Sequence, residues 1–393
     1  MPVIHVLFRD ALLGSTLAIA VLTPAAGAGV SHPAAQRGGT YTVLHNFAGP
    51  TGDGRYSYAE VTPDVSGNLY GTTDSGGAYG AGVIFEVATG GTESVVHNFG
   101  GAGDGITPEG AGIIDASGNM YGTTAFGGAS NDGTIWELAA DGTYTVLHSF
   151  ASDEGAYFRG RLIEDKAGNL YGTALFGGAD NGGTVFEYSA KGQLTVLHTF
   201  SGSGTDGADP EHGVVMDKSG NLFGVTAFGG TYNGGVVYEI AGDGTFTTLH
   251  SFSGGNDGDF PYGGLAIDSS GNLYGSTADG GAYKAGTVFK LAHGGTLTTL
   301  YSFTGGSDGG NPEGDMLLIG KDLYSTTTYG GAGNFGVVYE LTSKGKEKVL
   351  ADFTGTNGQA YSAGLAANGK TFYGTTEYGG TDGYGVVFSL TKK

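Results

Sequence analysis

A sequence unit of about fifty residues recurs along the whole chain. Its clearest landmark is a motif of the form L-H-x-F, whose second position returns at intervals of 52, 51, 50, 52, 51 and 50 residues. The chain therefore contains seven units, and that position is occupied by His45, His97, His148, His198, His250, Tyr301 and Ala351. A fixed period of this length indicates a propeller or a solenoid built from equivalent units.

Each unit contains four short runs of β-branched and aromatic residues, separated by clusters of Gly, Asp, Asn and Ser. Such runs and clusters are signals for strands and turns. In the fifth unit the expected strands are residues 263–268, 272–277, 286–291 and 297–303. Apolar residues do not follow helical spacing over any long stretch of the mature chain, so we expect almost no helix.

Seven four-stranded units predict an all-β, seven-bladed β-propeller. The first unit begins with a lone strand of the fourth type, residues 41–47, and the last unit stops after a strand of the third type. The N-terminal strand is therefore expected to complete the last blade and close the ring. A solenoid would need capping repeats at both ends, and none is visible. We predict one propeller domain over residues 40–393.

Two further motifs, G-N-L-Y-G-T-T and G-x-V-[FY]-E, recur at the same period. Matches to the first begin at residues 67, 118, 168, 220 and 271, with degenerate forms at 322–327 and 371–376. Together these motifs resemble the GloVer family of extracellular tandem-repeat proteins, and the resemblance covers the chain from about Thr40 onward. It implies a secreted repeat protein and implies little chemistry.

The first 28 residues have the features of a secretory signal peptide. Arg9 precedes an apolar run, residues 11–22, that is too short to span a membrane, and residues 26–28 form a small-x-small cleavage site. Residues 29–39 then form a flexible lead-in. We therefore expect a secreted, extracellular protein, with a buried or membrane-anchoring segment as the alternative.

Composition limits the possible partners. The chain has no cysteine, so sheet packing rather than disulfides must stabilise it in an oxidising compartment. Its formal net charge is −21, and a surface so poor in Lys and Arg repels phosphate backbones and anionic lipids. We therefore expect no nucleic-acid partner and no membrane insertion after signal cleavage. Carbohydrate, another extracellular polymer, cations and protein partners are compatible with this charge.

A carboxylate or amide followed by Gly recurs in the connections between blades, as Asp53, Asp104, Glu154, Asp206, Asp257, Asp308 and Asn357. Such side chains can supply oxygen ligands to Ca²⁺, but none has the spaced acidic ladder of an EF-hand loop. A turn with an Asx hydrogen bond explains them equally well. We assign no metal ligand and no cofactor, and Ca²⁺ is the minor alternative. The L-H-x-F histidines are expected to be packing residues.

The loops between second and third strands carry two sets of aromatic residues. The first set precedes a double glycine and repeats regularly, as Phe126, Phe176, Phe228, Tyr329 and Tyr378, so we expect it to pack between blades. The second set is less regular and comprises Tyr79, Tyr232, Tyr283, Phe335 and Tyr384. Exposed rings on one face are suited to stacking on sugars. Packing into the blade seams is the alternative for the second set also.

One position of the unit does not repeat. This position lies six residues before the Asp of the turn between the first and second strands, or at the equivalent place. It is occupied by Tyr58, Glu109, Arg159, Glu211, Tyr262, Glu313 and Ser362. In a propeller these side chains should ring the mouth of the central channel on the loop-rich face. Two residues further in, Glu60, Arg161 and Asp315 replace a small residue, and His212 follows Glu211. Because structural positions of a repeat converge on one residue type, this ring is the candidate ligand site. The alternative is that these charged side chains only keep the channel mouth hydrated and bind no ligand.

Three functions are compatible with these features, and the fold alone does not choose among them. We favour a secreted, non-enzymatic scaffold that binds carbohydrate or another polymer, and we assign no catalytic residue. The first alternative is a polysaccharide-active glycosidase or lyase that uses Glu109, Arg159, Glu211, His212 and Glu313. Since the three glutamates belong to non-adjacent units, the distance between them is the main objection. The second alternative is a surface or matrix protein with a structural or protein-binding role.

Overall fold

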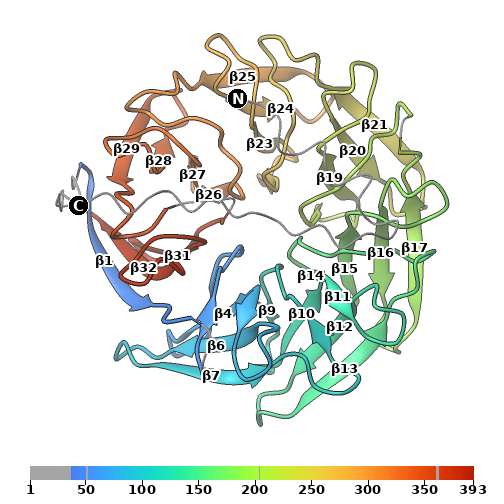
Figure 1. The fold of residues 1–393 in the computed structure, drawn as a ribbon. Helices are drawn as coiled ribbons and strands as arrows, with labels where there is room; N and C mark the ends of the chain where they lie inside the picture. Colours follow the sequence, from blue (N-terminus) through green and yellow to red (C-terminus); the bar gives the residue numbers. More distant parts are fainter. Residues whose placement is uncertain (1–36, 50–51, 203, 360–362) are drawn as a thin grey trace, which may run out of the picture. The chain divides into compact units, whose positions relative to one another are not determined.

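The computed structural model describes residues 37–49, 52–202, 204–359 and 363–393. They form strands, turns and loops, and the strands are arranged in seven four-stranded sheets around a ring (Figure 1). The all-β, seven-bladed propeller is thus confirmed. Within these ranges, no helix has the length and hydropathy that a membrane span requires. The expected signal peptide and most of the lead-in lie outside the described residues.

Each blade runs from a short inner strand to a longer outer strand. The inner strands are β3 (Thr62–Pro63), β9 (Ile113–Ile114), β14 (Ile163–Glu164), β18 (Val215–Met216), β22 (Ala266–Ile267), β26 (Leu317–Ile319) and β30 (Ala366–Asn368). The second strands are β4 (Leu69–Thr73), β10 (Met120–Thr124), β15 (Leu170–Ala174), β19 (Leu222–Thr226), β23 (Leu273–Thr277), β27 (Asp322–Thr326) and β31 (Thr371–Thr376).

The third strands carry the G-x-V-[FY]-E motif, and the outer strands carry the L-H-x-F motif. The third strands are β6 (Val83–Val87), β12 (Thr134–Leu138), β16 (Thr184–Tyr188), β20 (Val236–Ile240), β24 (Thr287–Leu291), β28 (Val337–Leu341) and β32 (Val386–Lys392). The outer strands are β7 (Glu93–Asn98), β13 (Tyr144–Ser149), β17 (Leu194–Thr199), β21 (Phe246–Ser251), β25 (Leu297–Ser302), β29 (Glu347–Asp352) and, in the last blade, β1 (Gly39–Asn46).

The N-terminal strand closes the ring. β1 pairs antiparallel with β32, with Tyr41 opposite Leu390 and Val43 opposite Phe388, so the blue and red ends of the chain share one sheet (Figure 1). The Tyr41 hydroxyl also donates a hydrogen bond to the carbonyl of Asn357 at 2.7 Å. The predicted completion of the last blade by the first strand is confirmed.

The hydrophobic core of the described chain is divided into seven clusters, each of which joins two neighbouring blades. The Phe of each L-H-x-F motif is fully buried and packs on the aromatic residue of the next blade's third strand. Phe150, for example, lies 5.2 Å from Phe186 between ring centroids. Gly172 stands opposite Phe186 across the ladder, and a Cβ there would lie 2.6 Å from the ring. Packing at the seams thus explains three of the repeated residue types.

Short ladders fix the loop-rich face. β2 (Gly54–Arg55) pairs with β5 (Ser75–Gly76), and β8 (Gly105–Ile106) pairs with β11 (Phe126–Gly127). Other blades have a single bridge at the same place, such as Ala156 with Phe176. Each pairing ties the connection into a blade to that blade's second-to-third loop.

The inner strand is shorter than the sequence suggests. In the fifth blade only Ala266–Ile267 is strand, whereas residues 263–268 were expected. The residues before it bond to the next blade instead of to their own sheet: the Gly264 amide donates to Asp315 Oδ1 at 2.7 Å, and the Gly264 carbonyl accepts from the Met316 amide at 3.1 Å. The chain at the channel mouth is therefore a set of interlocked segments rather than a continuous inner strand.

Candidate functional site

The backbone at the channel mouth has one shape in six blades. Two residues before the ring position it is left-handed, with φ between 55° and 63°, at Tyr56, Thr107, Tyr157, Asp209, Phe260 and Asn311. For residues other than Gly this conformation costs roughly 1 kcal/mol or more, so the fold must hold it in place. The backbone conformation is the same in these six blades, whereas the side chains at the ring position differ from blade to blade. The backbone is therefore explained by the fold, and the side chains are the candidates for function.

Arg159 of the third blade is the centre of the ring. Its Nε lies 2.7 Å from Glu109 Oε2 of the second blade, and its Nη1 lies 3.2 Å from Glu211 Oε2 of the fourth. The guanidinium carbon also lies 5.5 Å from the ring centroid of Tyr58 of the first blade. Arg159 therefore bridges Glu109 and Glu211. Although these two glutamates belong to non-adjacent blades, their carboxylates take part in one site.

Three further residues join this group. The Tyr157 hydroxyl donates to Glu109 Oε1 at 2.8 Å, and the Tyr58 hydroxyl donates to Glu377 Oε1 at 2.7 Å. Asp74 and Glu377 both interact electrostatically with Arg159. We call the whole set the mouth cluster; its members are Tyr58, Asp74, Glu109, Tyr157, Arg159, Glu211, Glu313 and Glu377.

Sequence reasoning missed Asp74, Tyr157 and Glu377, although a signal for two of them is present. The position that directly follows the second strand's Thr or its equivalent is Ala, Leu or Thr in five units, and it is Asp74 and Glu377 in the other two. This is the same departure from the repeat that marks the ring position. Tyr157 lies at a position that is Tyr in the first and third units and Thr, Asp, Phe, Asn or Ala in the others, so no departure from a common residue type marks it.

The carboxyl groups of the mouth cluster have too few counterions. Burial raises the pKa of Glu313 to about 8, and the neighbouring Glu211 adds to the effect. Burial likewise raises the pKa of Glu377 to about 7. In contrast, Glu109 and Glu211 outweigh the burial of Arg159 and hold the pKa of its guanidinium above the usual value. Protonated and ion-paired carboxyl groups thus stand side by side at neutral pH.

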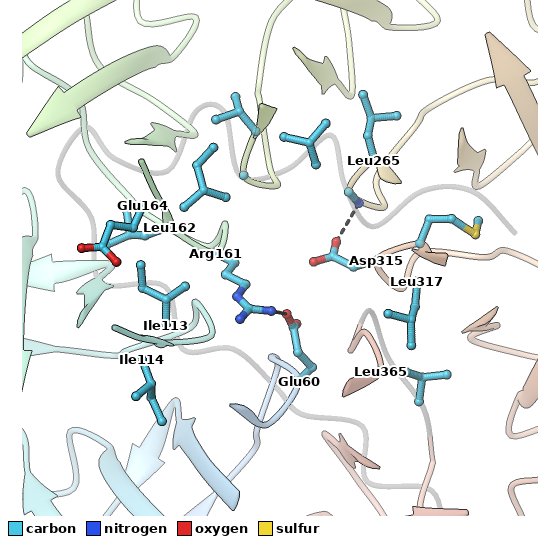
Figure 2. Close-up of a pocket in the computed structure, with 16 residues that line it drawn as sticks. Glu60, Ile113, Ile114, Arg161, Leu162, Glu164, Leu265, Asp315, Leu317 and Leu365 are labelled. Atoms are coloured by element: carbon cyan, nitrogen blue, oxygen red, sulfur yellow. Dashed lines mark hydrogen bonds and ion pairs between the residues drawn. The ribbon is translucent and has the colours of Figure 1, made fainter. Parts of the chain in front are cut away.

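A second polar layer lies deeper in the channel. Arg161 Nη1 lies 3.2 Å from Glu60 Oε1, and His212 Nδ1 lies 2.7 Å from Asp315 Oδ1. His212, expected at the mouth beside Glu211, therefore makes its ion pair in this inner layer. Figure 2 shows Arg161 and Glu60 pointing toward each other across the channel.

A cavity of about 410 Å³ begins at this inner layer. Glu60, Arg161 and Asp315 line it, and below them its wall consists largely of Ile, Leu and Val side chains, including Leu162 and Leu365 (Figure 2). No residue of the mouth cluster lines it. The two ion pairs of the inner layer therefore separate the mouth cluster from the apolar part of the channel.

The remaining predicted site residues are distributed differently. Tyr262 packs beside Phe260, with ring centroids 6.3 Å apart, and Ser362 lies outside the described residues. In the second aromatic set, Tyr79, Tyr232 and Tyr283 are exposed by 65%, 65% and 62%. Phe335 and Tyr384 are partly buried against the core clusters of their seams.

In the first aromatic set, Phe126, Phe228 and Tyr378 contact rings of the next blade, as Phe126 does against Tyr157 with centroids 5.1 Å apart. Phe176 instead contacts Tyr157 of its own blade, at 5.9 Å. Tyr378 of the same set is nevertheless 40% exposed. Tyr283 of the second set lies near Tyr301 on the outer strand β25 and interacts with it electrostatically. The exposed tyrosines of the second set, Tyr79, Tyr232 and Tyr283, are called the rim tyrosines below.

The Asp-Gly carboxylates face the L-H-x-F histidines. His97 Nε2 lies 2.9 Å from Asp104 Oδ2, and equivalent pairs form at His45, His148, His198 and His250. Where Tyr301 replaces His, its hydroxyl donates to Asp308 at 2.9 Å. Where the histidine position is Ala, the carboxylate is replaced by Asn357, which donates to a backbone carbonyl instead. Backbone amides, such as that of Gly105, also donate to these carboxylates. The contacts support the turn interpretation of this motif.

The chain matches one described repeat family over nearly its whole length. Residues 14–220 and 210–393 match the Gloeobacter/Verrucomicrobia repeat, in agreement with the GloVer resemblance. No curated protein matches the sequence.

Solved structures with the same architecture are distant in sequence. One is virginiamycin B lyase from Staphylococcus aureus, with 13% identity over 90% of this chain and 100% of that chain, and a TM-score of 0.60. A streptogramin B lyase has 12% identity over 91% and 98%, with a TM-score of 0.61. The extracellular domain of BT4673 from B. thetaiotaomicron has 13% identity over 91% and 42%, with a TM-score of 0.57. At such identities the likeness shows the fold alone.

Proposed function

We propose that this chain, which belongs to the Gloeobacter/Verrucomicrobia repeat family, is an extracellular propeller that binds carbohydrate at the mouth of its central channel. One observation carries the proposal. At a position of the unit that does not repeat, three consecutive blades supply Glu109, Arg159 and Glu211, and Arg159 contacts both carboxylates at 2.7 and 3.2 Å. Buried charges are expensive unless they are paired, so a fold that only needed to fill this mouth would use small residues.

The mouth cluster indicates the chemistry of its ligand. It contains five carboxyl groups, from Asp74, Glu109, Glu211, Glu313 and Glu377, and one guanidinium, from Arg159. Glu377 is only 2% exposed, and its Oε2 has no hydrogen-bond partner in the part of the chain that the structure describes. Carboxylates accept hydrogen bonds, so the ligand must bring donors. Hydroxyl and amino groups of sugars do so, whereas carboxylated or sulfated polymers would be repelled.

Aromatic rings beside these acceptors favour a sugar. Tyr58 and Tyr157 are half-buried and belong to the mouth cluster, and each uses its hydroxyl to hold a glutamate. Their rings are therefore fixed in orientation before a ligand arrives. A rigid aromatic face beside hydrogen-bonding groups suits a pyranose ring, which has apolar faces and a polar edge.

A second candidate function is hydrolysis or elimination on the same polymer. Glu313 carries a proton at neutral pH because its pKa is raised to about 8, while the neighbouring Glu211 is ion-paired with Arg159. A protonated and an ionised carboxyl group in one site is the arrangement that acid–base catalysis on glycosides requires. Binding is favoured because Glu211 is already engaged by Arg159.

One experiment distinguishes these functions. The mature chain, from residue 29 onward, is incubated with neutral, amino-bearing and acidic polysaccharides and separated by size exclusion. We expect co-elution with intact neutral or amino-bearing polymers and none with acidic polymers, because of the charge of the mouth cluster. Progressive shortening of a polymer would establish the enzymatic alternative. If acidic polymers co-elute best, or no polymer does, the proposed site and ligand class are wrong.

The extracellular location is part of the proposal. It is supported by the signal-like sequence of residues 1–28. An acidic chain with 17 Lys and Arg against 38 Asp and Glu is also suited to neutral polymers outside the cell.

A further inference from the structure

The seam between the last and the first blade differs from the others. In each of five blades a histidine of the outer strand faces a carboxylate of the following connection. Only beside His45 and Asp53 does a third metal-binding side chain, Glu93, join such a pair in the described chain, and the ligand atoms of the three all lie within 4.8 Å of one another.

Glu93 replaces a stacking residue. It is the first residue of β7, and the corresponding residue of the second blade, Tyr144, stacks on His97 with ring centroids 3.7 Å apart. Phe246 stacks on His198 in the same way at 3.8 Å. Two other blades place Leu at this position. Glu347 of the sixth blade is also charged, but the preceding blade carries Tyr301 in place of the histidine. Glu93 is therefore the charged side chain that stands where other blades pack an apolar residue against the histidine.

The position of Glu93 is unfavourable without a cation. Its Oε1 is shielded from solvent and has no hydrogen-bond partner among the described residues. Asp53, itself only 8% exposed, is the neighbouring carboxylate, and one of its oxygens lies within 4.8 Å of a Glu93 oxygen. Two carboxylates share one histidine here, whereas each of the other four pairs has a single carboxylate.

We propose that His45, Asp53 and Glu93 bind a divalent transition-metal ion such as Zn²⁺ through His45 Nε2 and one oxygen of each carboxylate. Imidazole nitrogen with carboxylate oxygen is a common zinc ligand set, and a water would complete four-coordination. His45 Nε2 and Asp53 Oδ2 are 3.2 Å apart, close to the edge of roughly 3.3 Å in a tetrahedron of such bonds. The histidine disfavours Ca²⁺, which prefers oxygen ligands throughout.

The ion would link the closure of the ring to the first blade. His45 lies on β1, the strand that completes the last blade, while Glu93 lies on the outer strand of the first blade. Both ligands are on strands, so their positions are fixed before binding. The site is independent of the mouth cluster and of the proposed carbohydrate binding. Its role is to stabilise the seam at which the two ends of the chain meet.

The repeat supplies matched variants for the test. Tyr301 shows that Tyr can occupy the histidine position and keep the hydrogen bond to the carboxylate. His45→Tyr and His97→Tyr therefore make the same change in two blades, of which one has the third carboxylate. Glu93→Tyr converts the position to the residue that the second blade uses. All three variants are compatible with the repeat and should fold.

The mature protein is stripped with a chelator and titrated with Zn²⁺ alone by calorimetry, and its thermal unfolding is followed with and without the ion. We expect one saturable site per chain, a rise in Tm that the chelator reverses, and no competition by Ca²⁺. His45→Tyr and Glu93→Tyr should weaken binding by about tenfold or more, whereas His97→Tyr should not. The absence of saturable binding, equal loss in His97→Tyr, or unchanged binding in Glu93→Tyr would each overturn the proposal.

Discussion

Single residues at the channel mouth carry charge that the fold itself does not require. Glu313 and Glu377 are almost fully buried, and their pKa values are raised to about 8 and about 7 because burial disfavours the ionised form. Arg159 is engaged by Glu109 and Glu211 and leaves these two carboxyl groups without a full counterion. Residues so placed reduce stability, which is characteristic of positions retained for a function.

The same residues make stability depend on pH. A carboxyl group whose pKa is raised in the folded state contributes stability that is complete below its unfolded pKa and is lost as pH rises through its folded pKa. For Glu313 this window runs from 4.5 to about 8, and for Glu377 from 4.5 to about 7. The free energy of unfolding, measured with urea, should therefore fall between about pH 5 and about pH 9.

Glu313→Gln should remove much of this dependence. Relative to the unmodified chain, we expect the free energy of unfolding to rise by about 1–3 kcal/mol at about pH 9 and to change little at about pH 5. Asp180→Asn, in an exposed loop, is the control and should leave the pH profile as it is. A Glu313→Gln profile parallel to that of the unmodified chain would show that Glu313 ionises normally.

At the scale of the element, the unit is held together by a few pairs that recur at each seam. Gly of the second strand, the aromatic residue of the third strand and the Phe of the preceding blade's outer strand pack as one group. In the third blade these are Gly172, Phe186 and Phe150. Their spacing in sequence is nearly constant, with Ser325 in place of Gly in the sixth unit, which is why the period of the chain was enough to predict the strands and the seams.

Gly172→Ala tests this packing. The new Cβ would lie 2.6 Å from the Phe186 ring and 2.7 Å from Leu162, so one of these buried side chains must move. We expect a loss of about 1–3 kcal/mol in the free energy of unfolding. Gly90→Ala, at an exposed turn where a Cβ meets nothing within 4 Å, should change it by less than about 0.5 kcal/mol. Equal effects in urea titrations of the two variants would contradict the role assigned to the seam.

The difference between repeated and unrepeated positions determines how much could be predicted from the sequence. Repeated residues reported the fold, and the unrepeated position led to Glu109, Arg159 and Glu211. The shortened inner strand was not predictable, because Gly264 bonds to a side chain fifty-one residues away rather than to its own sheet. The third ligand of the proposed metal site was also hidden, since Glu93 and His45 lie in different units and meet only after the ring closes.

At the scale of the whole molecule, the mouth cluster exists only in the closed ring. Its residues come from six of the seven blades, from Tyr58 in the first to Glu377 in the last, and the Tyr58 hydroxyl joins these two blades directly at 2.7 Å. The strand pairing of β1 with β32 completes the same seam from the outside. The proposed ligand binding at the mouth is therefore expected to be coupled to closure of the propeller through one set of contacts.

The central claim is that the ligand binds at the mouth cluster and not at the exposed rim. It is tested most directly by calorimetric titration of the best-binding neutral or amino-bearing polysaccharide into three proteins: the unmodified mature chain, Glu211→Gln, and the triple variant Tyr79→Ala, Tyr232→Ala, Tyr283→Ala. We predict that Glu211→Gln weakens binding by about tenfold or more, since a hydrogen bond to a charged group is lost. The triple variant should bind within about twofold of the unmodified chain. The reverse order, with binding abolished by the rim variant and retained by Glu211→Gln, would contradict the account.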